Sequence, residues 1–326
     1  MNKKPIKLGI VREFCDRHRH YVAACEELGI AHEVIDLSGP DWISRVRESG
    51  CDGFLVRPSG NLTVWKQMFD ERLAVLVEEL KRPIFPSLEE IWLYESKRRG
   101  HYWLAANGIP HPETWVFYDL DEALKWARGI SLPVVYKSDL GSASSGVRIF
   151  RQRWPLLWFI RKLFWWGFVR TGGDRRDRHW GCALFQEYLP EVREWRVIQI
   201  AGSYFAWRKG RRGDFHSGSA ITHWENPPTE LLDFAHDVNV RGGFSSMAID
   251  IFETTDGRWL VNELQTIFGT STTSQMQIDG LAGRYRRTPS GRWEFEEGLF
   301  SRNGCCNLRV EAFVAQLHRQ AAEEPR

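Results

Sequence analysis

A lysine followed by glycines and serines forms the first segment of this sequence that could bind a phosphate. Residues 137–147 read KSDLGSASSGV, with Lys137 at the end of the apolar run VVYK. Small residues such as Gly141 and Gly146 let backbone amides turn toward an anion, and the lysine adds a positive charge. A glycine and serine hairpin is also common as a solvated turn, so this segment alone leaves both interpretations open.

Two carboxylates on neighbouring strand-like segments could hold a hard cation. Asp250 lies in MAIDIF and Glu263 in WLVNELQ, thirteen residues apart around the turn ETTDG. A hairpin would bring them together, and the period of two along a strand puts the amide oxygen of Gln265 on the side of Glu263. A pair of exposed charges is the alternative, although an unpaired charge in apolar strand sequence is costly.

Two further positions could bind a nucleotide or a substrate. Glu187 and Tyr188 end the strand-like segment LFQEYL, and Leu189 and Pro190 then break it. Such a strand end can offer backbone donors and acceptors to an adenine edge. Arg57 lies in LVRPSGN at the carboxyl end of an expected parallel strand, the side on which open α/β sheets bind ligands. The alternative, that Arg57 is a surface arginine hydrogen-bonded to solvent, has the same weight as ligand binding.

The elements that must position these residues change in kind along the chain. From residue 6 to 87, apolar runs alternate with helical periodicity near residues 17–28, 40–48 and 62–80, which favours a small parallel sheet flanked by helices. Helices near 95–107 and after Asp119 or Asp121 follow. The second half is strand-like apart from a helix near 229–239, which predicts an antiparallel α+β arrangement. The dinucleotide motif GxGxxG and the phosphate-loop motif GxxxxGKS/T are absent.

The composition bounds the class of protein. The 326 residues are 43% hydrophobic and 26% charged, and 44 basic against 42 acidic side chains leave a formal net charge of +2. That charge gives no global field for nucleic acid, and no apolar run approaches the roughly 18 to 20 residues of a membrane span. With the polar start MNKKPIK, these features predict a cytoplasmic protein that does not bind nucleic acid. The six scattered cysteines are expected to be mostly reduced.

The order of these motifs resembles the ATP-grasp superfamily, and within it the carboxylate–amine ligases similar to ribosomal-protein glutamate ligase and glutathione synthetase. The resemblance covers roughly residues 85–275 and rests on ESKRRGHYWLAANGIPHPET, VVYKSDLGSASSGV, FQEYLPE, REWRV, GDFHSGSA, and AIDIF followed by NELQTIFG. It implies α/β and α+β classes, an ATP-grasp fold with an N-terminal Rossmann-like (pre-ATP-grasp) domain. The implied parts are an N-terminal α/β domain at 1–90, a central lid subdomain at 91–190 with a Trp-rich insertion at 151–180, and a C-terminal metal-binding subdomain at 191–326.

The resemblance assigns a role in ATP binding to three groups of residues. Lys97 and Lys137 match lysines that touch the phosphates. The flexible loop that closes over the phosphates matches residues 141–146, with Gly141, Ser142, Ser144, Ser145 and Gly146 as the candidate contacts. The hinge around adenine matches Glu187, Tyr188 and Leu189.

The resemblance also implies metal, catalytic and substrate residues. The ligands of Mg²⁺, with Mn²⁺ as an alternative ion, match Asp250, Glu263 and Gln265, where glutamine stands in place of the family's asparagine. The basic residues that line the phosphate and substrate region match Arg196 and Arg208, which are the catalytic candidates. His216 and Gly218 stand where the family has an arginine and an asparagine, and Arg57 and His216 are the substrate candidates.

The activity that the resemblance implies is ligation. Magnesium-bound ATP would phosphorylate a substrate carboxylate, and an amine would attack the resulting acyl phosphate; the partners would be small-molecule or peptide carboxylates and amines. Phosphoryl transfer needs mainly in-line positioning and charge neutralisation, which cations and basic side chains supply. Two alternatives stay open: a kinase of this superfamily that phosphorylates a hydroxyl, and an ATP-binding regulatory module with impaired catalysis. A homodimer is also compatible with the sequence.

A tryptophan-rich segment interrupts the resemblance. Residues 154–169 read WPLLWFIRKLFWWGFV, and between 151 and 180 eight basic side chains against two acidic ones leave +6. We expect a helix from about Pro155, too short to span a bilayer. Three interpretations stay open: a core helix of the lid subdomain, peripheral contact with a membrane surface or a lipid-linked substrate, and a self-association surface. The second predicts that the segment is not wholly buried in its own domain.

Overall fold

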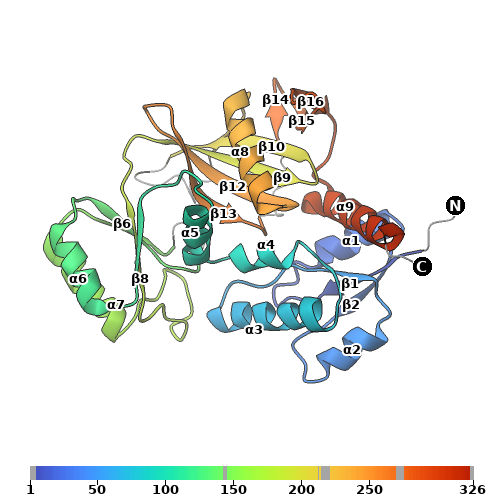
Figure 1. Cartoon of the computed structure of the whole chain (residues 1–326), viewed down its shortest axis with the longest axis horizontal. Coiled ribbons are helices and arrows are strands. Elements are labelled where there is room, and N and C mark those ends of the chain that lie inside the picture. The colour runs from blue at the N-terminus through green and yellow to red at the C-terminus, as the bar shows by residue number, and fades with distance from the viewer. Residues whose placement is uncertain (1–4, 142–144, 212, 214–220, 269–274, 324–326) are drawn as a thin grey trace.

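Three β-sheets organise the molecule. The computed structural model describes residues 5–141, 145–211, 213, 221–268 and 275–323. One sheet of four strands is parallel, a second sheet of four strands is antiparallel, and the third sheet has eight strands. Helices cover each of them, and the smaller antiparallel sheet extends away from the other two (Figure 1).

The N-terminal part is the small parallel sheet that the alternation of apolar runs and helices predicts. Its strand order is β2-β1-β3-β4. The strands are β1 (Lys7–Val11), β2 (Ala31–Ile35), β3 (Gly53–Leu55) and β4 (Ile84–Phe85). The helices are α1 (Arg19–Glu27), α2 (Trp42–Glu48) and α3 (Thr63–Ala74), which continues as a π-helical turn, η1 (Val75–Glu79).

The C-terminal helix α9 (Arg302–Glu323) returns to this N-terminal part (Figure 1). Its buried residues Val310 and Phe313 share one hydrophobic core with Leu8 and Ile10 of β1. The first turn of the helix is irregular, because Asn303 to Cys305 have left-handed backbone angles. The last helix of the described chain thus packs beside its first strand. The three predicted domains are continuous segments of the sequence, and their bounds stay a prediction.

The second sheet, which we call the lid sheet, has the strand order β5-β8-β6-β7. Its strands are β5 (Thr114–Phe117), β6 (Val134–Lys137), β7 (Val147–Phe150) and β8 (Ala183–Glu187). Helices α6 (Leu120–Gly129) and α7 (Arg153–Trp165) contribute to its core. The side chain of Asp119 caps α6 by accepting a hydrogen bond from the Glu122 amide at 2.9 Å, as the sequence suggests for a cap at Asp119 or Asp121.

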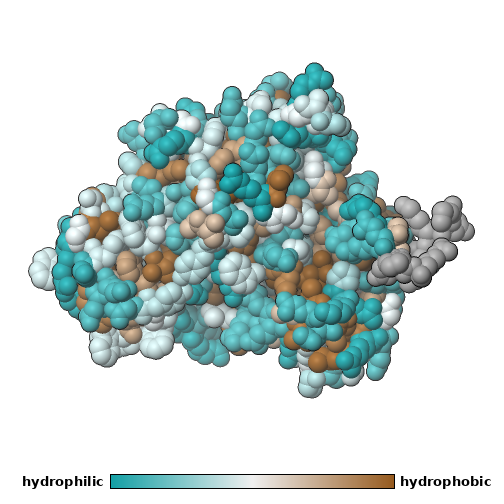
Figure 2. All heavy atoms as spheres, in the orientation of Figure 1, coloured by the Kyte–Doolittle hydropathy of each residue, from teal (hydrophilic) through white to brown (hydrophobic). Residues whose placement is uncertain are grey.

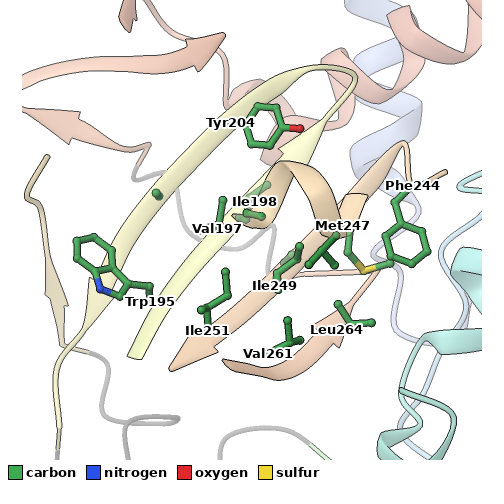
Figure 3. Packing of buried hydrophobic residues seen from close by; sticks show 14 of the residues in the cluster. Trp195, Val197, Ile198, Tyr204, Phe244, Met247, Ile249, Ile251, Val261 and Leu264 are labelled. Carbon is green, nitrogen blue, oxygen red and sulfur yellow. The ribbon is translucent and has the colours of Figure 1, made fainter. Parts of the chain in front are cut away.

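The third sheet is mainly antiparallel and carries the largest core. Its main path is β13-β12-β9-β10-β15-β14, with β11 paired to β10 and β16 to β15. The strands are β9 (Arg193–Ile200), β10 (Ser203–Lys209), β11 (Thr222–His223), β12 (Ser246–Glu253), β13 (Trp259–Gln265), β14 (Gln277–Ile278), β15 (Leu281–Arg287) and β16 (Trp293–Glu297). Helix α8 (Thr229–Gly242) packs on one face, where Val197, Ile249 and Leu264 lie (Figure 3).

Residues 88–106, which the sequence assigns to turns and one helix, form two helices between the sheets. They are α4 (Leu88–Leu93) and α5 (Lys97–Ala106). Ser87 and Glu90 form a reciprocal capping box at the start of α4, and Ser96 caps α5 by accepting from the Arg99 amide. Leu93 and Leu104 reach the core of the eight-stranded sheet, so these helices join the N-terminal part to it.

Hydrophobic residues are broken into separate patches among hydrophilic ones on the face drawn in Figure 2. Within the described residues, no helix combines the length and the apolar content that crossing a bilayer requires.

A fully buried carboxylate connects α4 to the eight-stranded sheet. Glu90 is 0% exposed and accepts from the backbone amides of Ser245 and Ser246 at 2.9 and 2.7 Å, and from the Ser245 hydroxyl at 2.9 Å. Burial raises the pKa of this carboxyl. Its hydrogen bonds therefore have to compensate for the loss of water around the group.

We predict that Glu90→Ala lowers the free energy of unfolding by about 3 kcal/mol, because several buried donors lose a charged acceptor. Urea unfolding followed by tryptophan fluorescence measures this. Glu89→Ala removes the same charge from an exposed neighbour and should change stability by less than about 0.5 kcal/mol. Equal stability of the two variants would contradict a joining role for Glu90.

Candidate functional site

One face of the eight-stranded sheet is polar, opposite the core face. In the antiparallel register Asp250 of β12 pairs with Arg196 of β9 on one side and with Glu263 of β13 on the other. Register partners point to the same face, so these three side chains form a row. Gln265 pairs with Ala248 and lies on the same face as Glu263, as the period of two predicts.

Asp250 is held between two cations. The Arg196 guanidinium donates to its two oxygens at 2.7 and 2.8 Å, and Lys209 of β10 donates to one of them. Lys209 also donates to Glu194 at 2.6 Å. Burial alone would raise the pKa of Asp250, but Arg196 and Lys209 outweigh it and hold this pKa far below its usual range. No local sequence pattern indicates this role of Lys209.

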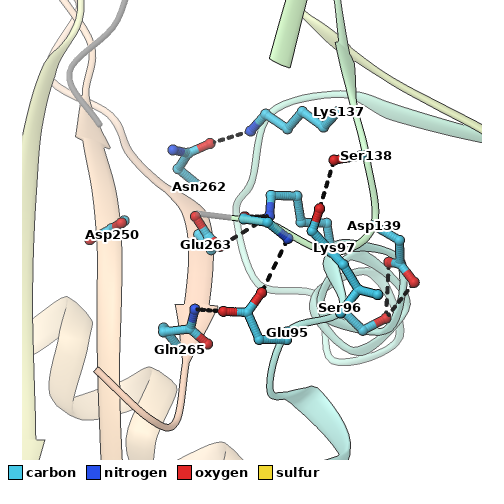
Figure 4. Close-up of polar contacts among 12 residues, drawn as sticks. Glu95, Ser96, Lys97, Lys137, Ser138, Asp139, Asp250, Asn262, Glu263 and Gln265 are labelled. Carbon is cyan, nitrogen blue, oxygen red and sulfur yellow. Dashed lines mark hydrogen bonds and ion pairs between the residues drawn. The ribbon is translucent and has the colours of Figure 1, made fainter. Parts of the chain in front are cut away.

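Lys97 lies at the start of α5, facing Glu263 (Figure 4). Its ammonium is 3.4 Å from the Glu263 carboxylate and donates to the Gly141 carbonyl at 2.7 Å. Burial alone would lower the pKa of Lys97, but nearby carboxylates, Glu263 first among them, outweigh it and raise this pKa. A charged lysine thus connects the metal-candidate strand to the beginning of the glycine and serine loop.

Lys137, at the end of β6, has a different partner. Its ammonium donates to the amide oxygen of Asn262 at 2.7 Å (Figure 4). Burial is the main reason that the pKa of Lys137 falls to about 8. A partly buried cation whose hydrogen-bond partner is neutral favours the arrival of an anion.

A β-bulge explains how Asn262 reaches Lys137. The register between β12 and β13 shifts between Asp250 and Ile251, which leaves Asn262 as the extra residue on β13. Strict alternation from Glu263 would put Asn262 on the core face, but a bulge re-aims the side chain. For this reason, the alternation of residues along the strand does not predict Asn262 as a site residue.

Lys97, Lys137, Asn262 and Glu263 line a pocket between the lid sheet, α5 and β13, whereas Asp250, Arg196 and Gln265 do not line it. The pocket is open to solvent on one side. The lining includes both lysines and Glu263, together with Ser96, Gly100, His101, Leu104, His111, Thr114, Leu184, Gln186, Val261, Asn262 and Leu264. A lining that combines Leu104, Leu184 and Val261 with two ammonium groups suits a ligand that has an apolar part and an anionic part.

The donor set for a cation is only partly available. The Gln265 amide donates to Glu95 at 3.2 Å, and its own oxygen is buried without a hydrogen-bond partner among the described residues. This orphaned oxygen and the Glu263 carboxylate are ligand types that Mg²⁺ accepts. The two oxygens of Asp250 are instead engaged by Arg196 and Lys209. Within the described chain, no three His, Cys, Asp or Glu side chains are arranged to hold a metal ion.

The glycine and serine loop falls partly outside the described residues, which include neither Ser142 nor Ser144. Its two ends pack closely. Gly141 has a φ of +126°, and a Cβ on Gly146 would lie 1.7 Å from the Ser138 hydroxyl oxygen, so a larger residue does not fit there. The carbonyl of Ser145 accepts from the Thr171 amide at 2.9 Å.

Several predicted site residues are not brought to this pocket. Arg208 alternates with Lys209 on β10, so it points to the opposite face, where it pairs with Glu225. Arg57 is buried in the N-terminal part, and burial lowers its pKa. His216 and Gly218 lie outside the described residues.

The predicted adenine hinge is only partly represented in the pocket. The strand end contributes Gln186 to the lining, one residue before Glu187. The Glu187 carboxylate accepts from the Glu113 amide at 2.8 Å, and the Tyr188 ring lies 5.7 Å from the Arg151 guanidinium. The hinge role of Glu187, Tyr188 and Leu189 therefore stays a prediction.

The arrangement of the sheets around this pocket matches solved structures along most of their length. D-alanine–D-alanine ligase from Bacillus anthracis, complexed with ATP, is 15% identical, with a TM-score of 0.61 over 98% of this chain and 100% of that chain. D-cycloserine synthetase is 17% identical, with a TM-score of 0.60 over 95% and 99%. An ATP-grasp domain protein of the RimK type from Sphaerobacter thermophilus is 16% identical, with a TM-score of 0.55 over 79% and 90%.

The chain has the ATP-grasp fold. This confirms the fold that the order of sequence motifs implies, and the α/β and α+β classes with it. No protein-family model matches the sequence, and no curated protein matches it significantly. The ATP-grasp likeness is therefore carried by the arrangement of elements, at identities between 13% and 17% among the similar structures.

The pKa of Lys137 predicts a pH dependence of nucleotide binding. The protonated amine attracts phosphate and the neutral amine does not, so affinity for MgATP is highest below pH 8 and falls as the pH rises through about 8. Lys137→Arg keeps the charge at every accessible pH and should remove this fall. Calorimetric titration between pH 7 and pH 9 measures both proteins. Parallel pH profiles would exclude Lys137 from phosphate binding.

Proposed function

We propose that the protein is an ATP- and Mg²⁺-dependent ligase that joins a carboxylate to an amine through an acyl phosphate. The observation that carries the proposal is the pocket itself: two partly buried lysines, one of them hydrogen-bonded to the neutral Asn262, face Glu263 in a pocket lined by both polar and apolar residues. The fold supports it, because the solved structures that share it include ligases and an ATP complex.

The chain's own residues supply binding and charge neutralisation. A substrate carboxylate oxygen attacks the γ-phosphorus of ATP and ADP leaves; the amine nitrogen then attacks the acyl carbon, phosphate leaves, and the amine loses a proton to solvent. Lys97 and Lys137 would hold the phosphate oxygens in both steps. Glu263 and Gln265 would hold Mg²⁺, which neutralises phosphate charge when bound. A role for Asp250 as an additional ligand requires that Arg196 or Lys209 release it.

The need for Arg196 or Lys209 to release Asp250 favours one alternative function, an ATP-binding regulatory module. Asp250 is engaged on both oxygens, so a metal site that needs it is closed in this state. The two functions differ in outcome: a module binds ATP without consuming it, whereas a ligase releases phosphate only when an acid and an amine are present. A hydroxyl kinase would release ADP and a phosphorylated alcohol instead.

The test uses hydroxylamine as a general amine. The purified chain is incubated with ATP, Mg²⁺, hydroxylamine and a library of small carboxylic acids and short peptides, and hydroxamates are identified by mass. We predict a hydroxamate from at least one acid with matching phosphate release, and an approximately 100-fold or larger loss of rate in Glu263→Gln. Glu297→Gln removes an exposed carboxylate on β16 and should leave the rate unchanged. ATP binding without any product would favour the regulatory module.

A further inference from the structure

Five tryptophans are exposed on one part of the lid region, although the chain has other tryptophans in its cores. Trp154, Trp158, Trp165, Trp166 and Trp180 are between 60% and 80% exposed. The first three lie on α7, and the other two lie within fifteen residues of its end. Large aromatic side chains gathered in water are unusual on a monomeric surface and indicate that something covers them.

Helix α7 divides these tryptophans from its core residues. Trp154, Trp158 and Trp165 recur at spacings of four and seven, which puts them on one side of the helix. The opposite side is buried in the lid core through Leu156, Leu157, Phe159, Ile160 and Leu163. The core-helix interpretation thus holds for one face only, and the prediction that the segment is not wholly buried is confirmed for the other.

Positive charge accompanies the exposed rings. Arg161 lies on the tryptophan side of α7, the Lys162 ammonium is 5.4 Å from the Trp158 ring centroid, and α7 contains no acidic residue. Arg178 donates to the Trp166 carbonyl at 3.0 Å. The two acidic residues between 151 and 180 have partners away from α7: Asp174 pairs with Arg176 at 2.7 Å, and Asp177 accepts from the Thr63 amide at 3.2 Å.

We propose that this surface, the tryptophan face formed by Trp154, Trp158, Arg161, Lys162, Trp165, Trp166 and Trp180, docks the protein on an anionic lipid bilayer. Tryptophan rings prefer the boundary between headgroups and acyl chains, and arginine or lysine beside them pairs with lipid phosphates. A second copy fits less well, because a two-fold pairing of α7 would place Arg161 and Lys162 against their own copies without a carboxylate on the helix.

Docking of this kind leaves the pocket accessible. Strand β8 alternates: Ala183 and Phe185 belong to the lid core with α7, whereas Leu184 and Gln186 line the pocket. Helix α7, with its tryptophans, and the pocket therefore lie on opposite sides of the lid sheet. A bilayer that covers α7 would contact the lid sheet without closing the ATP-binding side. The proposal of lipid docking is therefore tested independently of the ligase proposal.

Vesicle co-sedimentation of the full chain tests the docking. One set of vesicles is phosphatidylcholine alone, and the other contains about one third phosphatidylglycerol. We expect binding to the anionic vesicles that weakens with added salt, and weak or no binding to the neutral ones. Trp165→Ser with Trp166→Ser should lower the partition coefficient by at least about tenfold. Arg161→Gln with Lys162→Gln should lower it by roughly fivefold for each lost charge.

The matched control is Trp92→Ser, which removes a tryptophan that is 44% exposed on α4, outside the tryptophan face. This variant should bind vesicles as the native chain does. Unchanged circular dichroism and MgATP affinity would show that the two double variants are folded. Three results would each overturn the proposal: a native chain that sediments with neither vesicle, double variants that bind like the native chain, or a dimer that shields these tryptophans from quencher. Binding to a single-stranded RNA oligonucleotide without vesicle binding would also overturn it.

Discussion

Charges withdrawn from water on one face of the eight-stranded sheet must be neutralised by their neighbours, and the site is built around this constraint. Asp250 lies between Arg196 and Lys209, and Lys209 also reaches Glu194. Further along the same face Glu263 meets Lys97. Lys137 differs, because it donates to the neutral Asn262 and its pKa falls to about 8. Its burial is offset best when an anion enters the pocket, which is the physical reason to expect a phosphate there.

The three sheets hold this face against the lid. Glu90 links α4 to the start of β12, and the capped helix α5 positions Lys97 beside Glu263. Contacts of Gly141 join the lid sheet to α5 and to the residue before it: its carbonyl accepts from Lys97, and its amide donates to Glu95. The same lid sheet carries the tryptophan face on its other side. Nucleotide binding and surface docking are thus separate properties of one small sheet.

Local patterns in the sequence predicted what is local in the structure. The parallel first part, the hairpin around the loop, and Asp250, Glu263 and Gln265 on one face follow from alternation and turn residues. Asn262 did not follow, because a bulge breaks the alternation, and Lys209 did not because its role depends on the register between β9 and β10. The packing of α9 against β1 joins segments that are far apart in the sequence, so no local sequence pattern predicts it. Likewise, side chains alternate along β10, so Arg208 points to the face away from the pocket. A match to a short sequence motif does not show on which face a side chain lies.

The central claim is that the pocket between Lys97, Lys137 and Glu263 is a nucleotide site. A crystal structure of the chain with Mg²⁺ and a non-hydrolysable ATP analogue tests it most directly. The account predicts the phosphates within hydrogen-bond distance of both lysines, a cation on Glu263 and the Gln265 oxygen, and the adenine against the apolar lining near Leu184. An analogue bound elsewhere, or a cation that ignores Glu263, would contradict it.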